Sequence, residues 1–299
     1  MAYIIENANI LKDNHLQKRS LLIKENKIAS VRTDINQYKW MKMNAEPYIM
    51  TPTFVLLNNQ IPYKGTFQEI KKYMTEEFLL KGCTTLLTCV NVSYEREIPE
   101  KVREIKTALI GSPVDFIIGV KIPIKKLTQS FIRICKRERI PAIFVEINNT
   151  EELEKIPWGW IRDALFPFNS PLIPIVSSLA KKEAENYLSK WKTMMIKEKI
   201  PCLFEELAEN EPLTAVVLNK IGLFPQKACL MHGAEVSYNL YLKAREIKNV
   251  DEVSLFHYHG DRLVVTIHKG KVIRSGGEVL YRPGNGEYVK VKTPSFFTI

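Results

Sequence analysis

The chain has 299 residues, of which 45% are apolar and 25% are charged, the composition of an ordinary globular protein with one large domain or two smaller ones. No apolar run reaches the roughly 18 residues that a membrane helix needs, and the N-terminus lacks the basic and apolar regions of a signal peptide. The net charge of +10 comes from 43 basic and 33 acidic residues that are interspersed, which predicts a solvated basic surface. We therefore expect no membrane partner and no specific nucleic-acid partner.

Five cysteines are scattered along the chain without a C-x-x-C pair. Their odd number and apolar surroundings favour reduced, inert thiols and a cytoplasmic location. They are Cys83, Cys89, Cys135, Cys202 and Cys229.

The chain begins with short β-like segments. Residues 3–10 form the first candidate strand. Residues 21–24 and 27–31 flank Glu25-Asn26, a two-residue turn that indicates a β-hairpin. The N-terminal part is therefore predicted to be a β-sheet.

From the second fifth of the chain, strands alternate with helices. The predicted strands are 53–57, 84–90, 114–120, 142–147 and 172–176. The predicted helices are 67–81, 97–109, 126–137, 158–165 and 180–198, and residues 204–219 are predicted to form further helices. Strands alternating with helices of this length predict βα units and a parallel sheet.

The last third of the chain returns to β-structure. Residues 236–247 have the pattern of a strand, and residues 262–272 that of a hairpin around Lys269-Gly270. Because His268 stands beside this turn, we expect it to face solvent.

Residues 52–60, Pro-Thr-Phe-Val-Leu-Leu-Asn-Asn-Gln, resemble the segment that opens the metal site of the amidohydrolase superfamily. In that superfamily, which includes dihydroorotase, dihydropyrimidinase and allantoinase, Pro-Gly-Phe-Ile/Val-Asp-x-His-x-His ends the first barrel strand, and the two His bind zinc. Here Leu56 stands at the Asp position, and Asn58 and Gln60 stand at the two His positions. Since neutral amides are poor zinc ligands, the chain resembles a shortened, degenerate amidohydrolase without its metal.

Other segments carry the same resemblance. Residues 82–85, Gly-Cys-Thr-Thr, are similar to the Gly-Val-Thr-Thr signature of the family's second barrel strand, and residues 221–227 are similar to its "lGlyPrKG" signature. The hairpin 262–272 is similar to the family's final hairpin. The resemblance implies a TIM-like barrel beside a small β-sandwich made from both ends of the chain.

We predict an α/β fold in which residues 51–225 form an abbreviated TIM-like barrel and residues 1–50 and 226–299 form a composite β-sandwich. A complete barrel takes about 250 residues, so the middle segment accommodates five or six βα units rather than eight. Missing strands leave open sheet edges. We expect helix 180–198, a second copy of the chain or another partner to cover them.

The resemblance also places a degenerate binding site at the ends of the barrel strands, formed by Asn58, Gln60, Glu146 and Ser177. Glu146 stands near the position of a Lys that the family carboxylates to bridge two metals, and Ser177 follows the strand that the family ends in His. Two interpretations stay open: polar groups that fill a former metal site, or a pocket for a small polar ligand. We expect no catalytic residue and no metal, with zinc as the alternative if the site is atypical.

Two further motifs have alternative interpretations. His257-Tyr258-His259 has the spacing of a metal pair, but loop histidines outside the barrel mouth are the simpler explanation. Trp158 and Trp160 either pack at the start of a helix or form an aromatic wall of the pocket.

The resemblance and the missing ligands together predict a non-catalytic, degenerate amidohydrolase-like protein with a binding or assembly role. The alternative is a metal-dependent hydrolase that acts on cyclic amides or other non-peptide C–N bonds with an atypical site. A third hypothesis, a basic scaffold for an anionic surface, rests on the net charge alone.

Overall fold

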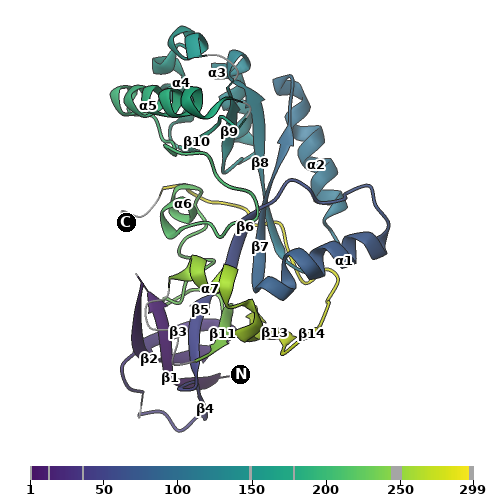
Figure 1. Ribbon diagram of the computed structural model, residues 1–299, viewed down its shortest axis with the longest axis vertical. Helices are drawn as coiled ribbons and strands as arrows, with labels where there is room; N and C mark the ends of the chain where they lie inside the picture. The colour runs from purple at the N-terminus through teal and green to yellow at the C-terminus, as the bar shows by residue number, and fades with distance from the viewer. Residues whose placement is uncertain are drawn as a thin grey trace.

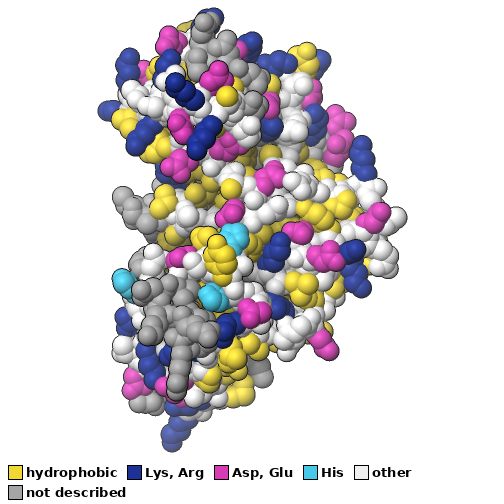
Figure 2. All heavy atoms as spheres, in the orientation of Figure 1, with side chains coloured by type: hydrophobic (Ala, Val, Ile, Leu, Met, Phe, Trp, Pro, Cys, Tyr) yellow, Lys and Arg dark blue, Asp and Glu magenta, His cyan; other side chains and the backbone are white. Residues whose placement is uncertain are grey.

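The computed structural model describes residues 2–12, 14–35, 37–147, 150–177, 179–243 and 251–295. Figure 1 shows two β-sheets, one with a layer of helices outside it and one made largely from the two ends of the chain. Lys and Arg side chains are interspersed with Asp and Glu on the face drawn in Figure 2.

The first sheet is parallel, with strand order β10-β9-β8-β7-β6. Its strands are β6 (Phe54–Leu57), β7 (Cys83–Asn91), β8 (Asp115–Pro123), β9 (Ile143–Glu146) and β10 (Leu172–Ile175). All five predicted barrel strands are thus confirmed, with ends that differ by at most three residues. They form a curled half-barrel, which agrees with an abbreviated TIM-like barrel.

Helices cover the outer face of this sheet. They are α1 (Phe67–Glu77), α2 (Ile98–Ala108), α3 (Gln129–Arg137), α4 (Trp158–Leu165) and α5 (Lys181–Glu198). Each contributes to the outer hydrophobic core, for example through Met74, Val102, Phe131, Ile161 and Trp191. The first helix ends earlier than predicted because a 3-10 turn, Leu79–Lys81, intervenes before Gly82, whose φ of +73° suits glycine.

The inner face of the half-barrel is filled by the chain itself. Strand residues such as Leu57 and Ile117 pack there against Val217 and Leu218 of α6 (Ala215–Lys220) and against Val291 of the C-terminal segment. Because both faces of the sheet are buried, its strands are continuous apolar runs rather than alternating ones.

One connection pairs with both outer strands of the half-barrel. At one edge the Leu172 amide donates to the Pro201 carbonyl (2.9 Å) and the Leu203 amide donates to the Leu172 carbonyl (2.9 Å). At the other edge the amides of Asn210 and Leu213 donate to the carbonyls of Leu57 (2.8 Å) and Val55 (2.9 Å).

Residues 201–213 therefore pair with the sheet edges that we expected helix 180–198, a second copy of the chain or another partner to cover. Helix α5 instead packs in the outer core through Tyr187, Trp191 and Met195. A second copy or another partner on the open side stays a prediction, as do the domain boundaries near residues 50 and 226.

The second sheet has the order β14-β13-β12-β11-β5-β1-β2-β3, with β4 beside β1. Its N-terminal strands are β1 (Ala2–Lys12), β2 (His15–Lys24), β3 (Lys27–Arg32), β4 (Met41–Asn44) and β5 (Tyr48–Pro52). Its C-terminal strands are β11 (Tyr238–Leu242), β12 (Leu263–His268), β13 (Lys271–Ser275) and β14 (Glu278–Val279). The two groups meet where β5 pairs antiparallel with β11, so the ends of the chain do combine in one body.

Two details differ from the predicted pattern in this region. The strand predicted at 236–247 starts at Tyr238 and ends at Leu242, and residues 244–247 lie outside the described residues. Residues 252–258 form helix α7 (Glu252–Tyr258), which Asp251 caps by accepting a hydrogen bond from the Ser254 amide (2.7 Å). In the described part of the chain, no helix combines the length and apolar character needed to cross a membrane.

Candidate functional site

A cleft of about 500 Å³ opens at the carboxyl ends of the parallel strands. This end of a βα sheet is where ligands bind in α/β folds generally. Its apolar lining comes from Leu57, Phe144, Ile175, Leu207 and Ala208. Its polar lining comes from Asn59, Lys121, Ser177, Glu206 and Glu209.

Asn58 lies beneath this cleft rather than in it. The side chain is fully buried, and its amide nitrogen donates to the Tyr73 hydroxyl (2.8 Å) and to Asn210 Oδ1 (2.6 Å). Its oxygen accepts from the Gln60 main-chain amide (3.0 Å) and lies 3.1 Å from the Tyr73 hydroxyl. With donors and acceptor occupied, Asn58 fixes the end of β6.

The carboxylates at the cleft are held by neighbouring groups. Asn59 Nδ2 and Gln60 Nε2 donate to the two oxygens of Glu209, at 2.7 and 3.2 Å. The main-chain amide of Val176 donates to Glu206 Oε2 (2.8 Å). Such contacts fix the orientation of a carboxylate without removing its charge.

Of the remaining predicted residues, Ser177 lines the cleft directly. Glu146 does not line the cleft itself but forms an ion pair (3.0 Å) with Lys121, which does. Gln60 likewise contacts the cleft through its hydrogen bond to Glu209. The structure thus gathers three of the four predicted residues around one cleft, and places Asn58 below it.

Sequence analysis missed four polar residues of the lining: Asn59, Lys121, Glu206 and Glu209. The position of Lys121 could have been recognised from the sequence, because this residue directly follows the apolar strand predicted at 114–120. Polar residues at such strand ends line the ligand sites of βα folds. Glu206 and Glu209 lie in an acidic stretch after the last predicted strand. Nothing in the sequence of that stretch indicates that the chain returns across the sheet there.

The groups around the cleft do not fit zinc. Zinc prefers imidazole, thiolate and carboxylate ligands, whereas amides replace the two imidazoles here and the Glu146 carboxylate is paired with Lys121. The Glu206 and Glu209 carboxylates do not form a group of three potential ligands with any other described residue. Cys89 is beside Asn59, but burial raises the pKa of its thiol to about 12, so it stays protonated near neutral pH.

His257 and Tyr258 are the last residues of helix α7, and His259 caps its end. These residues therefore do not form the loop that we expected. His257 Nε2 lies 3.0 Å from Glu211 Oε2 at the surface. The contact between His257 and Glu211 therefore fixes α7 against the segment before α6. Among described residues, the one group of potential metal ligands lies elsewhere.

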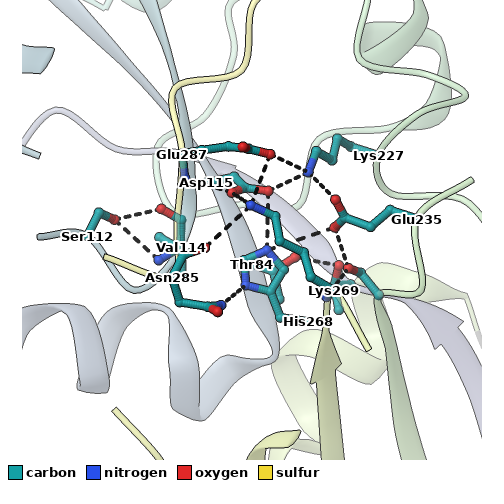
Figure 3. Close-up of polar contacts among 12 residues, drawn as sticks. Thr84, Ser112, Val114, Asp115, Lys227, Glu235, His268, Lys269, Asn285 and Glu287 are labelled. Carbon is teal, nitrogen blue, oxygen red and sulfur yellow. Dashed lines mark hydrogen bonds and ion pairs between the residues drawn. The ribbon is translucent and has the colours of Figure 1, made fainter. Parts of the chain in front are cut away.

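That group belongs to a buried ion cluster at the amino end of β8 (Figure 3). We use "ion cluster" for Asp115, Lys227, Glu235, His268, Lys269, Asn285 and Glu287. Asp115 opens β8 of the half-barrel, His268 ends β12 of the second sheet, and Glu287 belongs to the C-terminal segment. The ion cluster thus joins three parts of the fold.

Asp115 is the centre of the ion cluster and is fully buried. Its Oδ2 accepts from Lys227 Nζ (2.5 Å) and His268 Nε2 (3.2 Å). Its Oδ1 accepts from Lys269 Nζ (2.6 Å) and from the Glu287 main-chain amide (2.9 Å). Lys227 also pairs with Glu235.

The expectation that His268 faces solvent is wrong. The side chain is fully buried, with Nε2 facing Asp115 and Nδ1 3.1 Å from Asn285 Nδ2. An imidazole protonated on Nε2 alone satisfies both contacts. The β12–β13 turn packs beneath the half-barrel. The sequence pattern of a hairpin does not show whether another part of the fold will cover its turn.

Asp115, Glu235 and His268 have ligand atoms within 4.8 Å of one another. However, the Lys227 ammonium is bound to both carboxylates and already supplies a cation. The ion cluster is therefore described best as a charge-compensated contact between the two sheets. Its position at the amino ends of the strands is the side of βα barrels that serves stability.

The charges of the ion cluster make the stability of the protein depend on pH. Burial alone raises the pKa of Asp115, but the His268 hydrogen bond and the Lys227 charge outweigh it and hold that pKa well below its ordinary value. Burial alone lowers the pKa of Lys227, but Asp115 and Glu235 outweigh it, and the pKa is raised. Both groups therefore favour folding in their charged forms.

We expect the free energy of unfolding to be highest between about pH 4 and pH 10 with respect to these two groups. Below about pH 4 the unfolded chain takes up a proton that folded Asp115 resists, so stability falls. Above about pH 10 the unfolded chain releases a proton that folded Lys227 retains, so stability falls again. Urea unfolding across this range measures the effect. Glu46→Gln, in an exposed pair with Lys18, is the control that keeps both limbs, and a flat profile down to pH 2 would contradict the expectation.

No protein-family model matches the chain. Among curated proteins, the chain is 23% identical over 180 residues to the glycine–tRNA ligase beta subunit of Clostridioides difficile. That match covers 54% of this chain and spans only 25% of the subunit's length.

Solved structures give a fuller match. A D-hydantoinase structure has a TM-score of 0.68 at 13% identity, covering 99% of this chain and 100% of the other. The dihydropyrimidinase from Brevibacillus agri NCHU1002 has a TM-score of 0.63 at 11% identity, with 98% and 99% covered. A D-hydantoinase from a Thermus species has a TM-score of 0.56 at 12% identity, with 98% and 100% covered. At these identities the likeness establishes a shared fold.

Proposed function

We propose that this chain is a non-catalytic, amidohydrolase-like protein that uses the strand-end cleft to bind a small polar ligand. The fold shared with D-hydantoinase and dihydropyrimidinase supports the amidohydrolase-like kind. The observation that carries the rest is the donor set at the strand ends. Amides stand where the resemblance calls for imidazoles, and they hydrogen-bond to Glu209 and Tyr73.

The cleft has the make-up of a ligand pocket. Ligand pockets are mostly apolar and carry a few oriented polar groups. Here Phe144 and Ile175 form apolar walls, and the Glu206 carboxylate is oriented by a main-chain amide. Ser177 and Lys121 add a hydroxyl and an ammonium group on the same lining. These groups suit a ligand that has both an apolar part and hydrogen-bonding groups.

The second candidate is a metal-dependent hydrolase of cyclic amides or other non-peptide C–N bonds with an atypical site. The Asp115, Glu235 and His268 group favours it, because carboxylates and imidazole bind zinc. Against it, a metal there would have to displace Lys227, and the group lies at the opposite end of β8 from the cleft.

Metal content separates the two candidates. We expect protein purified without a His-tag or chelators to contain far less than one equivalent of zinc, iron, manganese or nickel per chain by plasma mass spectrometry. We also expect no hydrolysis of hydantoin or dihydrouracil. One or two equivalents of metal that are lost in Glu235→Gln would support the hydrolase and overturn the proposal. The same metal lost in Glu209→Gln would instead locate the metal in the cleft, and would overturn the proposal equally.

Ligand binding tests the cleft itself. A thermal-shift screen of small polar metabolites should give ligands that stabilise the wild-type protein but not Glu206→Gln. Glu205→Gln is the matched control, since Glu205 is an exposed neighbour outside the cleft lining. Ligands that stabilise all three proteins equally would place binding elsewhere and would contradict a role for the cleft.

A further inference from the structure

A second groove, of about 350 Å³, lies on the side of the half-barrel away from the cleft, where α2 faces the C-terminal segment. The C-terminal segment is fixed there by a single parallel bridge to β8, because the Phe116 amide donates to the Glu287 carbonyl (3.0 Å) and the Val289 amide donates to the Phe116 carbonyl (2.9 Å). The groove is thus part of the folded core and has a defined shape.

Aromatic and aliphatic side chains form the base of this groove. The ring of Tyr288 packs against that of Phe116, with centroids 5.8 Å apart. Ile110 stands beside them and is 73% exposed, so its side chain is available for contact with a ligand. These side chains offer an apolar surface for a planar group.

Two cations from α2 line the same groove. Arg103 and Lys106 are three residues apart on the helix and therefore project from the same side. Lys106 Nζ lies 4.0 Å from the centroid of the Tyr288 ring, a cation–π contact that holds the ammonium over the aromatic base. Among the described residues, neither cation has a carboxylate within ion-pair distance.

The nearby carboxylates are engaged elsewhere. Glu287 lines the groove, but its carboxylate lies 3.0 Å from Lys269. Glu138 acts on Lys106 from a distance and is 3.6 Å from Arg137. Burial, together with the charge of Lys290, lowers the pKa of Lys106 and outweighs the opposite effect of Glu138. The groove therefore carries excess positive charge above an aromatic base.

We propose that this groove binds an organic phosphate monoester with an aromatic body. A phosphate monoester carries a charge of about −1.5 to −2 near pH 7. This charge balances the two cations of the groove more fully than the single negative charge of a carboxylate ligand would. The guanidinium of Arg103 offers paired donors to phosphate oxygens, and Lys106 offers a point charge. The aromatic body packs on the exposed Ile110 side chain, beside the Tyr288 ring that Lys106 covers. This site is separate from the strand-end cleft and does not depend on the function proposed for it.

The test uses phenyl phosphate as the probe, with inorganic phosphate and phenol as partial probes, in calorimetric titrations of the full chain at low ionic strength. We expect phenyl phosphate to bind more tightly than either partial probe. Lys106→Met and Arg103→Gln should each weaken its binding about tenfold, the usual effect of losing one charge-assisted hydrogen bond. Lys190→Met, which removes an exposed lysine of α5, should leave binding unchanged.

Three results would overturn the proposal. One is the absence of measurable phenyl phosphate binding by the wild-type protein. Another is equal binding of phenyl phosphate by wild type, Lys106→Met and Arg103→Gln when all three have the wild-type melting temperature. The third is inorganic phosphate binding as tightly as phenyl phosphate, which would show that the aromatic base takes no part.

Discussion

Replacing Asp115 by alanine is expected to lower the free energy of unfolding by about 3–5 kcal/mol, the usual cost of removing one partner from a buried ion pair. The change removes the acceptor of two ammonium groups, of the His268 imidazole and of the Glu287 amide. Lys227 would stay buried with Glu235 and, at 3.9 Å, the exposed Glu287 carboxylate as its remaining partners. Urea unfolding followed by circular dichroism measures the loss.

The control for this variant is Glu46→Ala, which removes one partner of an exposed ion pair with Lys18 (3.0 Å). Exposed pairs contribute below about 1 kcal/mol, so this variant should unfold near the wild-type urea concentration. Equal effects of the two variants would mean that the ion cluster does not hold the sheets together. If Asp115→Ala is too unstable to purify, Asp115→Asn keeps the size and one oxygen that accepts two of the four hydrogen bonds, and should show a smaller loss of the same sign.

Replacing Gly286 by alanine is expected to destabilise the protein by about 3 kcal/mol, at the upper end of the cost of overpacking. A Cβ at this position would lie 1.9 Å from the Val114 carbonyl oxygen, and a main-chain atom cannot move aside as a flexible side chain can. The C-terminal segment would have to withdraw, which breaks the hydrogen bond from the Gly286 amide to Ser112 (2.9 Å) and the pairing with Phe116. Urea unfolding and binding of a dye that reports exposed apolar surface measure the two effects.

Gly277→Ala is the matched control for that variant. A Cβ at Gly277 meets no atom within 4 Å, so a methyl group there should change the free energy of unfolding by less than about 0.5 kcal/mol. A wild-type urea midpoint for Gly286→Ala would mean that the segment after β14 is not held against β8.

The elements of the half-barrel could be predicted from the sequence because their signals are local. Apolar runs such as the one around Ile117 end at turn residues, and Gly82 stops a helix and begins a strand. The path of residues 201–213 was not predicted: helices were expected over residues 204–219, but only Ala215–Lys220 is helical, and the preceding residues pair with both outer strands instead. Its hydrogen bonds to both outer strands use main-chain groups, which every sequence carries.

Residues of the candidate site could be predicted only where they stand at a position of the amidohydrolase sequence pattern. Asn58, Gln60 and Glu146 came from such positions, and the structure places two of them in contact with cleft residues. Glu206 and Glu209 come from the returning connection, so their position depends on the path of the chain. The burial of His268 likewise depends on contacts between two bodies, which no single segment specifies.

The pairing of β5 with β11 has a consequence for synthesis on the ribosome. Strand β5 leaves the tunnel early, but its neighbour on one side begins only at Tyr238, after the whole half-barrel has been made. Until then β5 presents an open strand edge, a template for pairing with other chains. The half-barrel also waits for residues 201–213 to complete its edges. The nascent polypeptide therefore passes through a long interval in which pairing of these edges with other chains competes with folding.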